Sequence, residues 1–290
     1  MHLAPLDNSV VFKKLFRDPA IVTAFVKDLI GVDLDITAEN IELEKQFVPT
    51  VGAVDIKIDI FVQDPKHRLV IEIQRQRYDY HADRFLYYHD VAKVELIRSY
   101  QDYRFGHTVY TIVWLPRRTR DPFLQHSIVT TSLCSVTESG EHLPIYPHRL
   151  YFLNPFYVNE HTPAGVADWL RLAVESITNP QHPTLNLERP ILERATQLIM
   201  EDGITPQERA QMFEETGYEN HLQLRYAEGQ KAGLEAGRQE GMQAGLETGQ
   251  RQKAQEIARA MLAQGMEPLL IAQVTGLTPD EVAKLGQGRA

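Results

Sequence analysis

The stretch Val54-Asp55-Ile56-Lys57-Ile58-Asp59-Ile60-Phe61-Val62-Gln63-Asp64-Pro65-Lys66-His67-Arg68-Leu69-Val70-Ile71-Glu72-Ile73-Gln74 decides the expected fold. Apolar and polar residues alternate in both halves, which is typical of strands that bury one face. The four residues from Asp64 to His67 have the composition of a tight turn. The stretch therefore predicts a β-hairpin over residues 54–74.

Two acidic residues face each other in this predicted hairpin. If the turn is centred between Pro65 and Lys66, Asp59 pairs with Glu72 and Lys57 pairs with Gln74, all on one face. Like charges directly opposite each other destabilise a sheet, so we expect a compensating cation, a metal ion or a protonated carboxyl group. Mg²⁺ fits such a pair, because it takes oxygen ligands and typically uses one or two carboxylates with waters and phosphate oxygens.

The flanking sequence predicts an α/β core over residues 1–160. A helix is expected over residues 9–30, capped by Ser9, interrupted by Pro19 and ended by Gly31. A strand over residues 41–48, a helix over 83–100 and a nearly continuous apolar strand over 109–115 complete a sheet covered on both faces. The fold class is therefore α/β, with a mixed central sheet flanked by helices. Residues 116–160 are expected to form a peripheral extension, with one late strand at Arg149–Leu153.

The rest of the chain is expected to be helical and to form three further parts. Residues 161–226 predict a helical extension, in which Thr205 and Glu208 form a capping box at the start of a new helix. Residues 251–290 predict a small unit of three helices, with a second capping box at Thr278 and Glu281. Because its last helix carries only Lys284 as a base, we favour a protein-contact or folding role over docking on DNA for this helix-turn-helix-like unit.

Residues 227–250 contain a glycine at every fourth position. The glycines are Gly229, Gly233, Gly237, Gly241, Gly245 and Gly249. Each glycine costs a helix about 1 kcal/mol relative to alanine, whereas closely packed helix backbones can offset that cost. The repeat therefore predicts a helical stalk that forms a homo-oligomer, and a flexible polar linker is the alternative.

Composition restricts the possible classes of protein. The chain has 290 residues, a formal net charge of −9 and a single cysteine, Cys134, which excludes an internal disulfide and suits the cytoplasm. No apolar run approaches the roughly 20 residues of a membrane span, and no secretory leader pattern opens the chain, so no membrane partner is expected. Residues 66–120 nevertheless carry eleven basic against six acidic residues, with interleaved tyrosines. That mixture can contact phosphates and stack on bases, although a solvated basic helix face gives the same pattern.

Several of these segments together resemble the PD-(D/E)XK nuclease-like transposase family, also called recombination-promoting or Rpn-like nucleases. The resemblance rests on Asp59 followed by Ile71–Gln74, on Val11–Phe16, on Asp83–Tyr88 and on Val109–Pro116. It covers roughly residues 8 to 120 and implies a restriction-endonuclease-like core with Mg²⁺-dependent DNA endonuclease activity. This chain departs from the superfamily at Gln74, where lysine is usual, although glutamine is frequent in this branch.

The resemblance implies roles for individual residues. Asp59 and Glu72 would hold Mg²⁺, for which Mn²⁺ can substitute, together with the carbonyl group of Ile73. Gln74 would orient the attacking water, and Lys57 either supplies the missing positive charge or only neutralises its acidic neighbours.

Further candidate residues surround this set. Either Glu42 or Glu44 is a candidate third acidic ligand, since only one of them can point toward the pair. DNA is the expected partner, and the expected nucleic-acid contacts are Arg75, Arg77, Arg84 and Tyr88. The alternative function is a catalytically inactive nuclease-like module that binds DNA or assembles oligomers.

Overall fold

The computed structural model describes residues 1–47, 56–75, 82–95, 105–119, 121–133, 135–143 and 145–287. These residues form two compact units, Met1–Glu219 and Asn220–Ala290.

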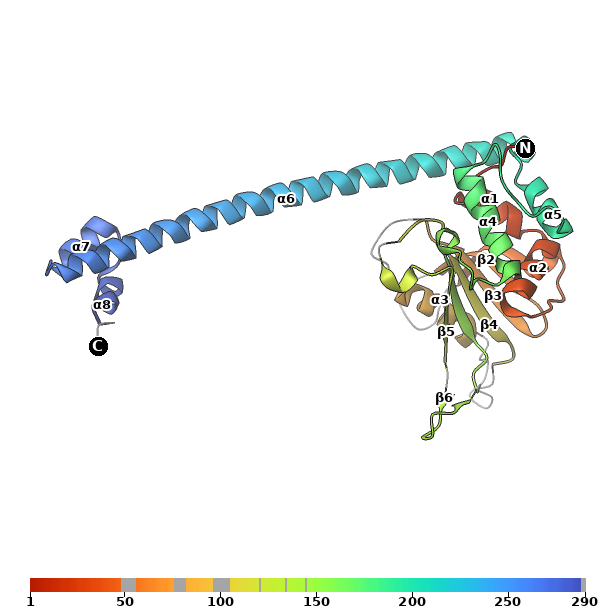
Figure 1. Ribbon diagram of the computed structural model, residues 1–290, viewed down its shortest axis with the longest axis horizontal. Coiled ribbons are helices and arrows are strands. Elements are labelled where there is room, and N and C mark those ends of the chain that lie inside the picture. Colours follow the sequence, from red (N-terminus) through yellow and green to blue (C-terminus); the bar gives the residue numbers. More distant parts are fainter. Residues whose placement is uncertain are drawn as a thin grey trace. The chain divides into compact units, whose positions relative to one another are not determined.

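A mixed sheet of six strands forms the centre of the first unit (Figure 1). The strand order is β1-β2-β3-β4-β8-β5, in which β3, β4 and β8 are parallel and the remaining neighbours are antiparallel. The strands are β1 (Ile41–Phe47), β2 (Ile56–Gln63), β3 (His67–Ile73), β4 (Thr108–Trp114), β5 (Ile128–Ser132) and β8 (Arg149–Leu153). A separate short hairpin consists of β6 (Ser135–Val136) and β7 (His142–Leu143).

Helices cover both faces of the sheet, which confirms the predicted α/β class. One face shares a core with α1 (Ser9–Phe16), α2 (Pro19–Ile30), α4 (Ala164–Thr178) and α5 (Pro190–Leu198), which lie close together in Figure 1. The other face packs against α3 (Asp83–Val94). The central strand β4 is buried along almost its whole length, as its apolar sequence predicts.

The predicted helix over residues 9–30 is a pair of helices, broken at Pro19 and ended by Gly31, which has φ 81°. The prediction that Ser9 caps the first helix is wrong. The cap is Asn8, whose side chain accepts a hydrogen bond from the backbone N–H of Val10 at 3.0 Å. Ser9 is instead the first helical residue and its hydroxyl group serves another contact, described below.

Part of the predicted peripheral extension belongs to the central sheet. The late strand expected at Arg149–Leu153 exists as β8, and it pairs in parallel with β4. β5 then pairs with β8 and forms the edge of the sheet. Four of the five residues of β8 are buried, so this strand contributes to the core on both faces, which the proline-rich and serine-rich sequence around it obscured.

The second unit contains most of α6 (Pro206–Ala263), with α7 (Pro268–Thr275) and α8 (Pro279–Gln287). Residues 227–250 are helical, as predicted, and both capping boxes form. A small core of Ala258, Ile271, Leu277 and Val282 joins the last three helical segments. Within the described residues, no helix combines the length and apolar character that crossing a membrane requires.

Candidate functional site

Asp59 on β2 and Glu72 on β3 meet where the backbone ladder of the hairpin ends. The two strands pair as far as Ile60 and Ile71, in the register that the turn predicts. One step further, side chains replace the ladder: the N–H of Asp59 donates to Glu72 Oε1 at 2.9 Å, and the N–H of Ile73 donates to Asp59 Oδ2 at 3.1 Å. Each carboxylate therefore binds the backbone of the opposite strand, which holds the two acidic groups together.

The strand β2 is irregular at Asp59. Ile58 packs in the core under α3, whereas Ile60 packs in the core with α1 and α2. Residues two apart point to the same face of a regular strand, so the alternation reverses at Asp59. On β1, the pairing skips Glu44, which has φ 57°, an uncommon backbone conformation for a residue other than glycine. Asp59 is thus outside both ladders, and its carboxylate is available to other partners.

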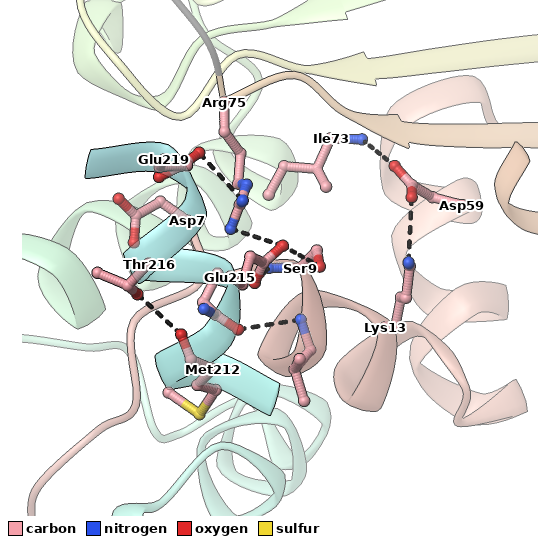
Figure 2. A network of polar contacts seen from close by, with 12 residues as sticks. Asp7, Ser9, Lys13, Asp59, Ile73, Arg75, Met212, Glu215, Thr216 and Glu219 are labelled. Atoms are coloured by element: carbon pink, nitrogen blue, oxygen red, sulfur yellow. Dashed lines mark hydrogen bonds and ion pairs between the residues drawn. The ribbon is translucent and has the colours of Figure 1, made fainter. Parts of the chain in front are cut away.

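Lys13 of α1 is a cation at this site that the sequence analysis did not identify. Its Nζ lies 3.2 Å from Asp59 Oδ1 (Figure 2), and it also lies 3.0 Å from Glu44 Oε1. Burial alone would lower the pKa of Lys13, but the charges of Asp59 and Glu44 outweigh burial and raise it. Lys14 beside it gives the same signal in the sequence, so only the packing of α1 distinguishes the two lysines.

Of the two candidate third acids, Glu44 shares the ammonium group of Lys13 with Asp59, whereas Glu42 pairs with Lys45 within β1. Lys57 Nζ is 2.7 Å from Glu44 Oε2. Hydrogen bonds from Lys57 and then Lys13 lower the pKa of Glu44 to about 2. Lys57 therefore neutralises Glu44, and the described cation on Asp59 is Lys13.

Glu72 is a buried acid, with 3% of its surface exposed. Burial, and secondly the charge of Asp59, raise the pKa of Glu72 to about 8. The N–H of Asp59 and the positive charges of Arg84 and Lys13 act in the opposite direction without offsetting this rise. The pair therefore favours a bound proton or an additional cation.

The donor atoms at the pair fit a hard divalent cation in type. Two carboxylates and the nearby carbonyl group of Ile73 are oxygen ligands of the kind that Mg²⁺ prefers. The described part of the chain contains no group of three or more His, Cys, Asp or Glu side chains placed to hold a metal ion. A metal here would depend on two carboxylates, with a carbonyl group, water and substrate oxygens completing its shell, which is a common arrangement for Mg²⁺.

Arg84 of α3 connects Gln74 to the opposite face of the sheet. Its Nη1 donates to Gln74 Oε1 at 3.2 Å, and its Nε donates to Tyr88 Oη at 3.0 Å. The Tyr88 ring lies under the guanidinium group, 5.2 Å from ring centre to Arg84 Cζ, and only 9% of the residue is exposed. Tyr88 thus supports Arg84 and offers little surface on which a base could stack.

The basic residues of the stretch 66–120 do not form one exposed surface. Arg68 is buried and donates to the backbone oxygen of Ala92 at 3.2 Å, so it is structural. Arg75 follows Gln74 and is paired with acidic residues of α6. Arg77 lies outside the described residues.

Comparison with known protein families gives a match at the C-terminal end of the chain, outside the candidate site. Residues 251–287 match the family model described as the Rpn/YhgA-like nuclease family, C-terminal HTH domain. No curated protein and no solved structure matches the chain. The match covers α7, α8 and the end of α6. Together with the motifs of the first 120 residues, it supports the assignment of this chain to the Rpn/YhgA-like nuclease family.

Proposed function

We propose that this chain is a Mg²⁺-dependent DNA endonuclease of the recombination-promoting type, and that Mn²⁺ can substitute for Mg²⁺. The observation that carries the proposal is the meeting of Asp59 and Glu72 at an interrupted strand, where Glu72 is buried beside a second carboxylate. The family match at residues 251–287 supports a nuclease.

The contacts described above support the following roles. Asp59, Glu72 and the carbonyl group of Ile73 would hold the cation, which supplies an activated water and neutralises charge on the phosphate. The Oε1 atom of Gln74 already accepts from Arg84, so its amide N–H groups remain to orient a water or a phosphate oxygen. Glutamine carries no charge, and we assign the positive charge near the reacting phosphate to Arg84 and Lys13.

Cleavage of supercoiled plasmid DNA tests this function. Wild type should cut only with Mg²⁺ or Mn²⁺, and Asp59→Ala and Glu72→Ala should each lower the rate by at least about 100-fold, because each removes a ligand and an electrostatic partner. Asp33→Ala is the matched control, since the side chain of Asp33 is 78% exposed. Variants that cut DNA as fast as wild type would place the active site elsewhere.

A non-catalytic DNA-binding or assembly module is the second candidate, favoured by the absence of a lysine at position 74. In that case wild type binds DNA in a salt-dependent manner without cutting it. Gln74→Lys separates the two candidates further, because a lysine should raise the rate of an active nuclease.

We also propose that residues 227–250 mediate self-association. All six glycines of the repeat have open space where a Cβ atom would lie, so a second helix could approach the backbone there.

A further inference from the structure

The first turns of α6 cover Arg75 at the end of β3. Glu215 Oε1 lies 2.7 Å from Arg75 Nη1, and Glu219 Oε1 lies 3.0 Å from Arg75 Nη2 (Figure 2). The side chain of Arg75 is only 13% exposed as a result. Arg75 is two residues beyond Ile73, whose N–H binds Asp59. An arginine expected to bind phosphate is therefore occupied by two carboxylates beside the acidic pair.

The same two glutamates bind other parts of the first unit. Glu215 accepts hydrogen bonds from the backbone N–H of Ser9 at 3.1 Å and from the Ser9 hydroxyl group. Glu219 Oε2 lies 3.3 Å from Arg117 Nη2. Ser9 is one helical turn from Lys13, so α1 contacts both the covering helix and Asp59, as Figure 2 shows.

The covering segment, residues 206–219 of α6, is attached mainly by charge. Its inward side consists of Glu208, Met212, Glu215 and Glu219, which recur at helical spacing. Glu208 pairs with Lys14 at 2.9 Å, and Met212 is the apolar side chain of this segment that packs against the described core. The ion pairs of Arg75 are largely shielded from solvent, since 13% of the Arg75 side chain and 19% and 12% of the Glu215 and Glu219 side chains are exposed. A guanidinium group in such a place requires an anionic partner, and the phosphate groups of DNA could take the place of the glutamates.

We propose that residues 206–219 form an autoinhibitory latch, in which Glu215 and Glu219 occupy the place of DNA phosphates on Arg75 and are displaced when DNA binds. The proposal rests on the proposed function and adds regulation to that site. Carboxylates and phosphates both bind a guanidinium group through paired hydrogen bonds, so they compete for Arg75. If only a small fraction of the molecules is unlatched, the apparent affinity for DNA is the affinity of the unlatched form multiplied by that fraction.

The first test removes the two charges of the latch. Glu215→Gln/Glu219→Gln should bind a short fluorescent DNA duplex about tenfold more tightly than wild type, because the unlatched fraction rises. Glu214→Gln/Glu228→Gln is the matched control, since both residues are exposed on α6 and the change in net charge is identical. Adding Arg75→Gln to the first variant should abolish its gain.

The second test leaves the net charge unchanged. Met212→Ser removes the apolar contact of the latch and should tighten DNA binding in the same direction. Phe213→Ser is its control, because Phe213 is 72% exposed on the same helix. Hydrogen exchange of residues 206–219 provides a reading without DNA: it should quicken in both latch variants and in neither control, while exchange of the sheet remains slow.

The outcomes separate the latch from the proposed function. If residues 206–219 exchange faster in the latch variants but the DNA affinity of these variants equals that of the controls, the contact is only structural and the latch proposal is wrong. The latch proposal is also wrong if hydrogen exchange of residues 206–219 is the same in the latch variants as in wild type. If wild type shows metal-dependent cleavage and the latch variants match their controls, only the latch fails. If no variant binds or cuts DNA, the proposed function fails and the latch with it.

Discussion

Glu72, one of the two carboxylates of the candidate site, destabilises the folded chain at neutral pH. Its pKa is raised from 4.5 to about 8, so its contribution to stability is most favourable below pH 4.5 and is lost as pH rises toward 8. Glu72→Gln keeps an oxygen that can accept from the N–H of Asp59. At pH 7 this variant should be more stable than wild type by about 1 to 3 kcal/mol, with no cleavage activity.

Urea unfolding between pH 5 and pH 8 checks this expectation. The difference in the free energy of unfolding should widen as pH rises. A Glu72→Gln protein that is less stable than wild type at pH 7 would contradict the account of a strained, buried carboxylate.

The buried His89 on α3 should make the free energy of unfolding depend on pH in the opposite direction. The residue is 3% exposed, and its Nδ1 lies 2.9 Å from Thr111 Oγ1. Burial, and then the charge of Lys93, lower the pKa of His89 to about 4. The neutral ring therefore contributes its full stability above pH 6.5, and this is lost as pH falls toward 4.

Between pH 7 and pH 5, wild type should lose about 2 kcal/mol more free energy of unfolding than His89→Gln. His161→Gln is the control and should follow wild type, because the side chain of His161 is 88% exposed. Parallel curves for wild type and His89→Gln, measured by urea unfolding, would show that the ring does not resist protonation.

At this scale the sequence predicted the meeting of Asp59 and Glu72 from the position of the turn, which is a local signal. Gln74 follows two residues after Glu72, just beyond the end of β3. Lys13 could not be found in this way, because its contact joins α1 to β2 across the core. The ion pairs of Arg75 with Glu215 and Glu219 were equally hidden, since they join residues more than a hundred positions apart.

At the scale of elements, the glycine stripe of α6 gives a test of packing. Gly237→Ala/Gly241→Ala should raise the helix content and stabilise the helix by about 1 kcal/mol per site, since no atom lies within 4 Å of either new Cβ. Gly237→Leu/Gly241→Leu should instead dissociate an oligomer whose backbones pack closely at the stripe. Gln243→Leu, an exposed change off the stripe, should not. Circular dichroism and sedimentation distinguish these outcomes.

The elements themselves were mostly predictable from periodicity and capping. The hairpin, the break at Pro19 and both capping boxes depend on residues within a few positions of each other. The place of β8 beside β4 did not follow from such signals, because that pairing joins strands separated by more than thirty residues. The reversal at Asp59 breaks the alternation on which strand prediction depends.

For the whole molecule, the first unit should fold without the glycine repeat. A chain ended after residue 226 retains the sheet, its covering helices and the ion pairs of Arg75. It should unfold cooperatively near the temperature of the full chain and have a smaller mass in light scattering. Equal oligomeric masses for the truncated and complete chains would make the repeat a linker.

The irregular backbone at Glu44 has a consequence beyond the acidic site. β1 is an edge of the sheet, and edge strands expose backbone groups that can pair with another chain. The φ of 57° at Glu44 interrupts that row in its middle, and Glu42 and Lys45 add charges along it. A strand from another molecule could form backbone hydrogen bonds only with the short regular segments of β1 on either side of Glu44. We therefore expect the distortion at Glu44, whose side chain pairs with Lys13, to make this edge less able to add a strand from another chain and so to limit aggregation.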